Sequence, residues 1–218
     1  MNPKSKRVRA VQNMKQNLIL DAALKIIARD GYYAARLEDI ADEAGFSKAS
    51  LYHYFPDREA LVLQLIMREQ NNLIDNCNEI IERHTDAIGA LRAIIHLMFS
   101  TMFKHSQFHK SFGDIIESRI SNMANIAAKH SDLFQSIIAG KEEITGIFLR
   151  VIEEGLGQKA FKTSLDSKTV SIYIQSIIQG VFMQTCMEGY DHFNVEEQTD
   201  KLLLFLKPLL AKQDGEGK

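Results

Sequence analysis

The chain has 218 residues, of which 45% are hydrophobic and 25% charged, so it has the composition of a globular protein that can bury a sizeable core in one domain or two. Its formal net charge of -2 excludes a protein that attracts polyanions through overall charge alone. The two cysteines, Cys77 and Cys186, exclude a disulfide framework or a zinc knuckle, and they fit a reducing cytoplasm.

Charge is unevenly divided along the chain. Residues 1–68 contain eleven Lys and Arg against eight Asp and Glu, a balance of +3, which leaves -5 for the remainder. The N-terminal third is therefore where a polyanion would be bound. The basic tail fits a solvated, disordered end, with a phosphate or minor-groove arm as the alternative. Its cations are Lys4, Lys6, Arg7 and Arg9.

Two helices separated by glycines are predicted after the tail. Apolar residues at helical spacing over 19–27 predict one helix face, and Gly31 suits the left-handed position after a helix C-terminus. The same spacing over 37–44 predicts a second helix, which Gly45 ends.

A short helix and a long one are predicted next. Ser47 is placed to cap the short helix, which turns Leu51 and Phe55 inward. Pro56 ends it, and Asp57 caps the long fourth helix. Three helices with a tight turn between the second and third make a helix-turn-helix unit.

The rest of the chain also has helical spacing and no strand alternation, so the predicted fold class is all-α. The predicted elements are a helix over 85–103, less periodic sequence over 104–130, a helix beginning at 131, a helix over 141–154, a polar loop over 157–168 and a last helix over 195–210. Asn194 with Glu197 makes a capping box for the last helix.

The segment 169–187 has no charged residue, and its length is close to that of a membrane span. Gln175, Gln179 and Gln184 lie inside it, and such side chains are unfavourable in lipid but readily accommodated in a protein interface. We therefore expect a buried helix at an oligomer interface and no membrane span.

The short third helix has two faces of different chemistry. Small residues at Ala49 and Ser50 let its start approach base edges, and the hydroxyls of Tyr52 and Tyr54 can donate to phosphates. Arg58, at the start of the next helix, fits a cation that reaches a phosphate. The alternative is that the two tyrosines only pack at a solvated rim.

One run of the sequence resembles the N-terminal domain of the TetR family of bacterial repressors: DGYYAARLEDIADEAGFSKASLYHYFPDREAL. The family has a Gly-aromatic pair, a helix with Ile-Ala, an Ala-Gly-hydrophobic-Ser turn, a Leu-Tyr-x-His/Tyr-Phe helix, and a basic residue before Glu-x-x-Leu. The matching positions are Gly31-Tyr32, Ile40-Ala41, Ala44-Gly45-Phe46-Ser47, Leu51-Tyr52-His53-Tyr54-Phe55 and Arg58-Glu59-Ala60-Leu61. The resemblance covers about residues 15–65.

The resemblance implies a role for each matching position. The positions that face bases are Lys48, Ala49, Ser50 and His53, and those that face phosphates are Ser47, Tyr52, Tyr54 and Arg58. The sequence departs from the family where Ala35-Arg36 replaces the Thr or Ser that usually opens the second helix. A side-chain cap is therefore missing there, and Arg36 fits a phosphate contact instead.

One helix-turn-helix unit meets only a few base pairs, so useful specificity needs a symmetric pair that reads two half-sites of an inverted repeat. The resemblance implies a homodimer whose seam is built from the last two helices. The predicted interface residues are Ile174, Ile177, Ile178, Gly180, Val181, Phe182, Leu203 and Leu206. The alternative is that the helix over 169–187 is central in the monomer.

The middle of the chain is rich in methionine and phenylalanine, which can line an adaptable apolar pocket. The candidates are Met98, Phe99, Met102, Phe103, Phe108 and Phe112. TetR-like regulators hold an effector in such a region. The alternative is that these methionines and phenylalanines are ordinary core residues. His105 and His109 lack an assured third ligand, so we expect no metal site, and no motif indicates catalysis or a cofactor.

The sequence therefore predicts a cytoplasmic, all-α transcriptional regulator. We expect a DNA-binding domain over 1–65 and a helical effector-binding and dimerisation domain over 66–218. The most favoured function is a homodimeric repressor that a small, largely apolar effector releases from double-stranded DNA. The alternatives are an activator or dual regulator with the same fold, and a ligand-binding protein whose helix-turn-helix is unused.

Overall fold

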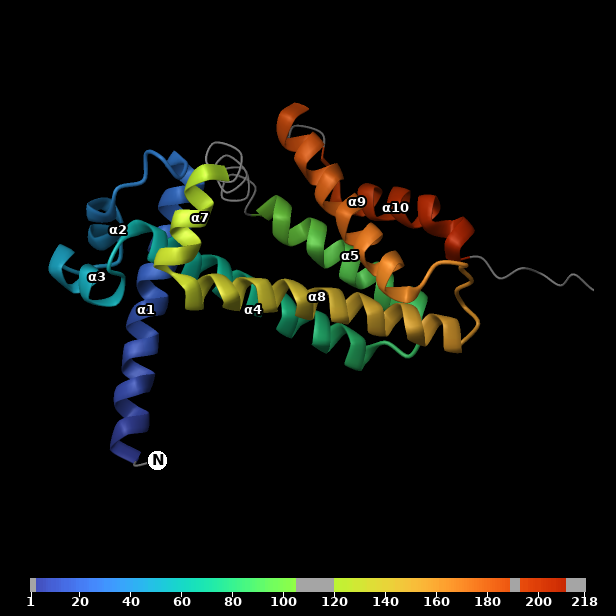
Figure 1. Cartoon of the computed structure of the whole chain (residues 1–218), viewed down its shortest axis with the longest axis horizontal. Helices are drawn as coiled ribbons and strands as arrows, with labels where there is room; N and C mark the ends of the chain where they lie inside the picture. The colour runs from blue at the N-terminus through green and yellow to red at the C-terminus, as the bar shows by residue number, and fades with distance from the viewer. Residues whose placement is uncertain (1–2, 105–119, 189–192, 211–218) are drawn as a thin grey trace, which may run out of the picture. The chain divides into compact units, whose positions relative to one another are not determined.

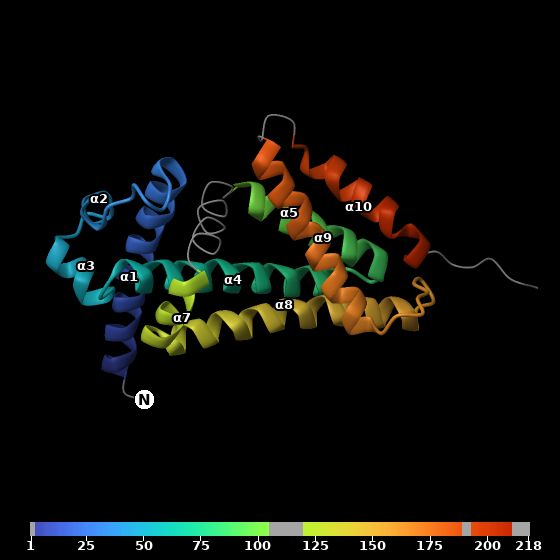
Figure 2. The same ribbon diagram turned by 45° about the horizontal axis from the view of Figure 1, so that its top comes forward.

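The computed structural model describes residues 3–104, 120–188 and 193–210, and within these ranges it contains helices and connections but no strand (Figures 1 and 2). This confirms the all-α fold class. The helices are α1 (Pro3–Asp30), α2 (Leu37–Glu43), α3 (Lys48–Tyr54), α4 (Arg58–Arg83), α5 (Ala87–Lys104), α7 (Ile120–Lys129), α8 (Ser131–Gly157), α9 (Ser167–Glu188) and α10 (Val195–Leu210).

The helices form two compact units. Unit 1 contains α1, α2, α3, the start of α4 to Glu69, and α7 with the start of α8 to Ile137. Unit 2 contains the rest of α4 and of α8 together with α5, α9 and α10. The predicted boundary after residue 65 lies inside α4, but α7 groups with unit 1 although it follows that boundary in sequence.

The core of unit 1 is built from the predicted apolar faces. Ile19, Leu51 and Phe55 are fully buried there, together with the apolar positions of α2 and the first turns of α4. α1 begins at Pro3, so the basic tail that was predicted to be disordered is helical instead. Proline suits the first position of a helix, and no glycine or second proline interrupts the residues that follow up to Asp30.

The core of unit 2 lies along α5, which packs against α9 and α10. Among the described helices, α5 alone has the length and mean hydropathy (1.2) of a membrane span. Its buried side chains, from Ala87 to Phe99, belong to the core of unit 2. An ionic cluster on the surface ties α10 to α5, because Arg92 pairs with Glu196 and Asp200.

α8 is one continuous helix, which corrects the expectation of separate helices beginning at 131 and 141. Gly140 lies within this helix and does not break it. A β-carbon at Gly140 would lie 2.9 Å from Oε1 of Gln70, so the missing side chain leaves room for the Gln70 side chain of α4. The chain leaves α8 through Lys159, whose φ of 56° folds Phe161 back onto Gly155.

Candidate nucleic-acid interface

The turn between α2 and α3 fixes the direction of the short helix. Gly45 has a φ of 72°, a left-handed conformation that glycine adopts without strain. The Phe46 amide donates to the Ala41 carbonyl (2.9 Å), and the Ser50 amide donates to the Ser47 hydroxyl (3.2 Å). The predicted Ser47 cap is therefore confirmed, and α3 starts at a defined position against α2.

α3 is held by two side chains and presents the rest outward. Leu51 and Phe55 have no exposed surface, as predicted. The outward side chains are Lys48, Ala49, Tyr52 and His53, which are exposed, and Ser50 and Tyr54, which are half-buried. The Tyr54 ring packs edge-on against the rings of Phe46 and His53, so it also supports the position of its neighbours.

Lys48 is the cation at the start of α3. It forms an ion pair with Glu38 of α2, and its ammonium lies 5.9 Å from the centre of the Tyr52 ring. The hydrogen bond that Lys48 donates to the Glu38 carboxylate raises the pKa of Lys48 and lowers the pKa of Glu38. Both side chains are about half exposed, so this pair is weak and opens readily for a stronger anion.

Arg58 and Arg36 lie in different surroundings, although a phosphate contact was expected of both: Arg58 matches a phosphate-facing position of the family, and Arg36 departs from the family pattern. Arg58 is half-buried, donates to the Ala35 carbonyl and stacks over the Tyr32 ring at 5.3 Å, so it fastens the α1–α2 connection to α4. Arg36 is exposed at the N-cap position of α2, where it makes no side-chain cap. The structure therefore confirms the prediction that α2 begins without a side-chain cap.

Asp57 fixes the start of α4. Its carboxylate accepts the Ala60 amide (2.7 Å), which confirms the predicted cap, and it pairs with Lys129 at 2.7 Å. Nε2 of His130 lies 3.1 Å from the same carboxylate without the alignment of a hydrogen bond. Burial raises the pKa of Asp57, but the hydrogen bonds from Lys129 and Ala60 outweigh it, and the pKa is lowered overall.

A hollow of about 360 Å³ lies beside α3, and one of its lining residues, Lys15, belongs to α1. It is lined by Lys15, Phe46, Ala49, Ser50, His53 and Tyr54. Sequence reasoning did not select Lys15. The signal that could have found it is the absence of acidic residues from the first twenty positions.

The structure places half of the predicted dimer residues elsewhere. Ile174, Ile178, Phe182 and Leu206 are at most 2% exposed, and all but Phe182 belong to the core cluster of unit 2. The remaining four are half-buried or exposed: Ile177, Gly180, Val181 and Leu203. The uncharged sequence of α9 did not reveal which side of the helix faces α5, so the core side was included in the predicted interface.

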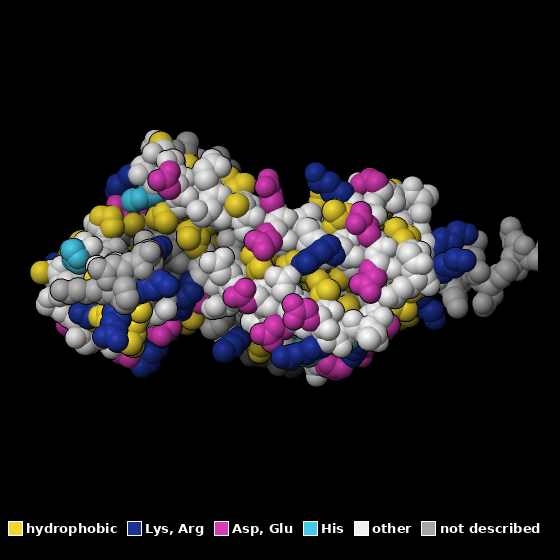
Figure 3. Space-filling model, turned by 90° about the horizontal axis from the view of Figure 1, so that it is seen from below, with side chains coloured by type: hydrophobic (Ala, Val, Ile, Leu, Met, Phe, Trp, Pro, Cys, Tyr) yellow, Lys and Arg dark blue, Asp and Glu magenta, His cyan; other side chains and the backbone are white. Residues whose placement is uncertain are grey.

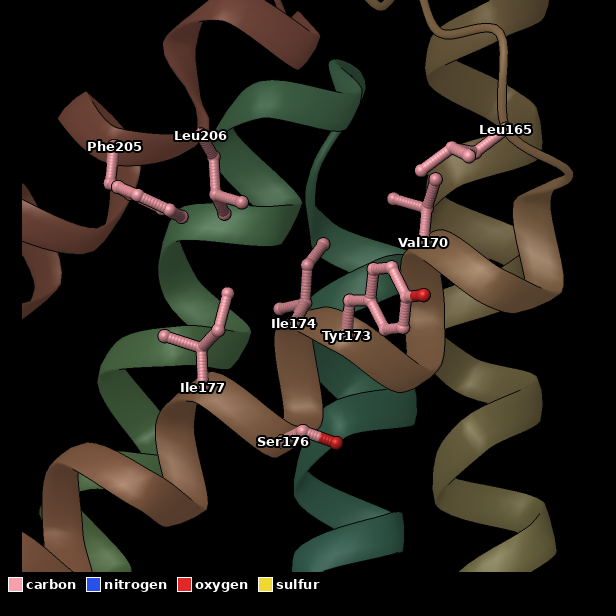
Figure 4. Close-up of a pocket in the computed structure, with 8 residues that line it drawn as sticks. All are labelled: Leu165, Val170, Tyr173, Ile174, Ser176, Ile177, Phe205 and Leu206. Atoms are coloured by element: carbon pink, nitrogen blue, oxygen red, sulfur yellow. The ribbon is translucent and has the colours of Figure 1, made fainter.

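The apolar residues that α9 and α10 do expose were not selected. Tyr173 is 57% exposed, and Leu204 and Phe205 are each 68% exposed. Tyr173 and Phe205 border a hollow of about 480 Å³ in unit 2, shown in Figure 4. The lining residues are Leu165, Val170, Tyr173, Ile174, Ser176, Ile177, Phe205 and Leu206.

The predicted pocket residues lie in and beside the core of unit 2. Met98 and Phe99 are buried, and Met102 and Phe103 are half-buried. The Phe103 ring stacks on Phe193 with 5.3 Å between centres. The other candidates lie outside the described residues, as do the two histidines considered for a metal: Phe108, Phe112, His105 and His109.

Residues 19–65 match the family model described as "Bacterial regulatory proteins, tetR family". The chain is similar to the transcriptional activator FasR of Mycolicibacterium smegmatis, with 26% identity over 68% of this chain and 69% of that protein. It is also similar to the transcriptional repressor KstR2 of Rhodococcus jostii, with 23% identity over 68% of each.

A solved structure shows the same fold. The transcriptional regulator FadR of Bacillus subtilis, in complex with stearoyl-CoA, superimposes with a TM-score of 0.69 at 22% identity. The superposition covers 89% of this chain and 97% of that one.

Proposed function

Since the chain belongs to the TetR family of bacterial transcriptional regulators, which bind DNA and are not enzymes, we propose that it is a homodimeric repressor that a small effector releases from an inverted-repeat operator. The observation that carries this proposal is the outward face of α3. It presents small, aromatic and cationic side chains from a helix that is capped, short and anchored on two buried residues.

The contacts proposed for α3 follow from its exposed side chains. Lys48, Ala49, Ser50 and His53 face base edges, where Lys donates to guanine and Ala contacts a thymine methyl. Ser47, Tyr52, Tyr54 and Arg36 contact phosphates, which set the position of α3 on the duplex. Arg58 has a positioning role and makes no phosphate contact in this proposal, because its guanidinium already binds the Ala35 carbonyl and the Tyr32 ring.

We assign the dimer interface to the exposed apolar face of α9 and α10. Leu204 and Phe205 extend most of their surface into solvent, and Phe205 also lines the apolar hollow of unit 2. Contiguous exposed apolar surface of this kind marks interaction sites. Gly180 is exposed on α9, and a residue without a side chain lets a second helix approach closely. A partner copy would cover both helices and bring two α3 helices to two half-sites.

A direct test separates this interface from the core. Leu204→Ser is expected to shift the protein from dimer to monomer in sedimentation analysis, because it removes apolar surface at the seam. Ile88→Ser is the matched control, since Ile88 is a 46% exposed apolar residue on α5 outside the assigned face. Equal effects of the two substitutions would contradict the assignment.

The effector is proposed to be small and largely apolar, and it binds in unit 2. Met102 and Phe103 are the predicted pocket residues that remain partly exposed there. Long-chain acyl-CoA thioesters are the first compounds to test, because a protein of this fold is solved with stearoyl-CoA. An effector shifts the balance only if it binds one conformation of the dimer more tightly than the other.

The relatives differ in the sign of regulation, since one is a named activator and another a named repressor. Activation is therefore the second candidate function. Transcription from the bound site, measured in a cytoplasmic extract with and without the protein, distinguishes the two: a repressor lowers it and an activator raises it.

The first experiment is selection of bound duplexes from a random-sequence library. Enrichment of an inverted repeat is expected. Absence of any enrichment by a folded dimer, with and without acyl-CoA, would contradict DNA reading by this chain.

Two lysine variants then test whether α3 is the reading element. Lys48→Gln is expected to weaken binding to the enriched site about tenfold or more, which corresponds to about 1.4 kcal/mol. Lys25→Gln is the matched control, because Lys25 also pairs with a glutamate of α2, Glu43, but from α1. Its effect should stay below about twofold, as for a surface ion pair away from the contact.

A further inference from the structure

The first part of α1 has a charge that the rest of the chain does not share. Residues 1–20 contain five cations, Lys4, Lys6, Arg7, Arg9 and Lys15, and no Asp or Glu, so their balance is +5 in a chain whose net charge is -2. The first acidic residue is Asp21. A segment of this composition repels itself unless an anion lies beside it.

The first turns of this part of α1 are exposed to solvent. Residues 5–14 are exposed, and Figures 1 and 2 show the first turns of α1 extending past α2 and α3. In the view of Figure 3, the surface formed by unit 1 carries Lys and Arg side chains interspersed with hydrophobic ones. The exposed hydrophobic residues of this part are Val8, Val11, Met14 and Leu18.

The cations in the first half of α1 differ in their partners from the other described cations of unit 1. Within the described residues, each of those others except Arg36 is bound by a carboxylate or a carbonyl: Lys25 by Glu43, Arg29 by Asp30, Lys48 by Glu38, Arg58 by Ala35, Arg68 by Asp21 and Lys129 by Asp57. Within the described part of the chain, Lys6, Arg7, Arg9 and Lys15 have no carboxylate within ion-pair distance. They are therefore available for an anion outside the protein.

Lys15 connects this helix to the DNA-facing surface. It lines the same hollow as Ala49, Ser50 and His53 of α3, so an anion that Lys15 binds lies beside the bases that α3 faces. Arg7 is eight residues earlier. At about 100° per residue it lies about 80° around the helix from Lys15 and about 12 Å along it. Val11 falls between the two, about 40° from Lys15, and Val8 lies about 20° from Lys15 on its other side.

We propose that the N-terminal half of α1 is a second DNA-contacting element, which binds duplex flanking the half-site that α3 reads. Lys15 binds a phosphate next to that half-site, and Arg7 binds one about 12 Å further along the duplex. Val8 and Val11 then lie against sugars or thymine methyls, which accounts for apolar residues on the exposed side. The inference rests on the proposed function and extends the contact by three to four base pairs per half-site, at about 3.4 Å per base pair.

The test measures the salt dependence of binding to the enriched duplex. Each lost phosphate contact lowers the slope of log K against log salt by about 0.9. Arg7→Gln and Lys15→Gln are each expected to lower the slope by about that amount. Lys6→Gln is the matched control, because it removes the same charge from the same helix, but about 180° around it from Lys15. The slope of log K against log salt for Lys6→Gln should equal that of the unsubstituted protein.

A second readout uses duplex length. Removal of three to four flanking base pairs on each side should weaken binding of the unsubstituted protein and leave binding of Arg7→Gln almost unchanged. Equal slopes for Arg7→Gln, Lys15→Gln and Lys6→Gln, with no effect of flank length, would overturn the inference while leaving α3 as the reader. If the unsubstituted protein bound no duplex at all, that result would instead contradict both the proposed function and this inference.

Vesicles of an anionic phospholipid provide the competing partner. If Arg7→Gln and Lys15→Gln keep their salt slopes on DNA but lose co-sedimentation with vesicles, the element binds a membrane surface and the DNA assignment is wrong. Unchanged vesicle behaviour with reduced DNA slopes is the expected result.

Discussion

Two glycines of α8 should respond in opposite directions to the same substitution. Gly155 lies under the Phe161 ring, and a β-carbon placed there would be 2.0 Å from Cδ2 of that ring. Gly146 lies in the same helix, and a β-carbon there meets no atom within 4 Å. Alanine at either position has the same preference for helix, so the difference between them reports the Phe161 contact.

The magnitudes follow from packing. Gly146→Ala is expected to stabilise the protein by about 1 kcal/mol, the helix-propensity difference between the two residues. Gly155→Ala must displace a ring that is only 5% exposed, and forcing extra atoms into a packed site costs about 1–3 kcal/mol. Because the β-carbon would approach the ring to 2.0 Å, we expect the upper end of this range, which leaves a net destabilisation of about 2 kcal/mol after the same gain in helix propensity. For a chain of this length about 1 kcal/mol shifts the Tm by about 2–4 °C. The two variants should therefore lie on opposite sides of the unsubstituted protein in a thermal melt.

A double substitution identifies the cause. In a Phe161→Ala background the obstructing ring is gone, so the further change Gly155→Ala should cost nothing or stabilise slightly. Two results would contradict this reasoning: a Tm of Gly155→Ala as high as that of Gly146→Ala, or a destabilisation by Gly155→Ala that persists in the Phe161→Ala background. Either would mean that the contact between the Phe161 ring and Gly155 does not stabilise the C-terminal end of α8.

Three further predictions concern single groups. Ser47→Ala should cost about 1 kcal/mol in chemical denaturation and weaken duplex binding, since it removes the acceptor for the Ser50 amide, whereas Ser47→Asp, which keeps a cap, should retain most of the stability. Asp57 has a pKa below its ordinary value of 3.8, so its charge contributes stability above that pH and loses it as the pH falls through the folded value. The free energy of unfolding of Asp57→Asn, which keeps the cap, should therefore fall below that of the unsubstituted protein at neutral pH and converge with it in acid. Burial raises the pKa of Cys77 to about 11, so in a Cys186→Ser background a thiol reagent should react slowly with the native protein and quickly after denaturation.

The sequence predicts the helix-turn-helix well because its signals are local. Gly31 and Gly45 mark left-handed positions, Ser47 and Asp57 mark caps, and the spacing of Leu51 and Phe55 shows which side of α3 is buried. Each of these signals acts within about one turn of its own residue. The family pattern adds contact roles, but it does not show that Arg58 is bound to a carbonyl 23 positions earlier.

The same reasoning fails for α9 because the deciding contacts are distant in sequence. α9 is uncharged from Thr169 to Met187, so periodicity does not identify its buried side. The choice is made by α5, which takes Ile174 and Ile178 into the core and leaves Tyr173 outside. The prediction for the basic tail was wrong for another reason. It was based on composition, which favoured disorder, whereas the residues after Pro3 form one uninterrupted helix with those that enter the core of unit 1 from Ile19 onward.

The start of α4 joins the elements on which DNA reading depends. Asp57 ties it to Lys129 at the end of α7, and Arg58 ties it to Ala35 in the connection between α1 and α2. Phe55, two residues before Asp57, anchors α3 in the core. α4 itself contains residues of both units, because the division falls after Glu69 within this helix. Coupling between an effector and DNA needs an element whose position both can bias, and the first turn of α4 meets that requirement at the DNA end. A substitution such as Lys129→Gln, which loosens this turn without touching α3, should therefore change the effector concentration needed for release from the operator more than it changes the sequence preference of the selected sites.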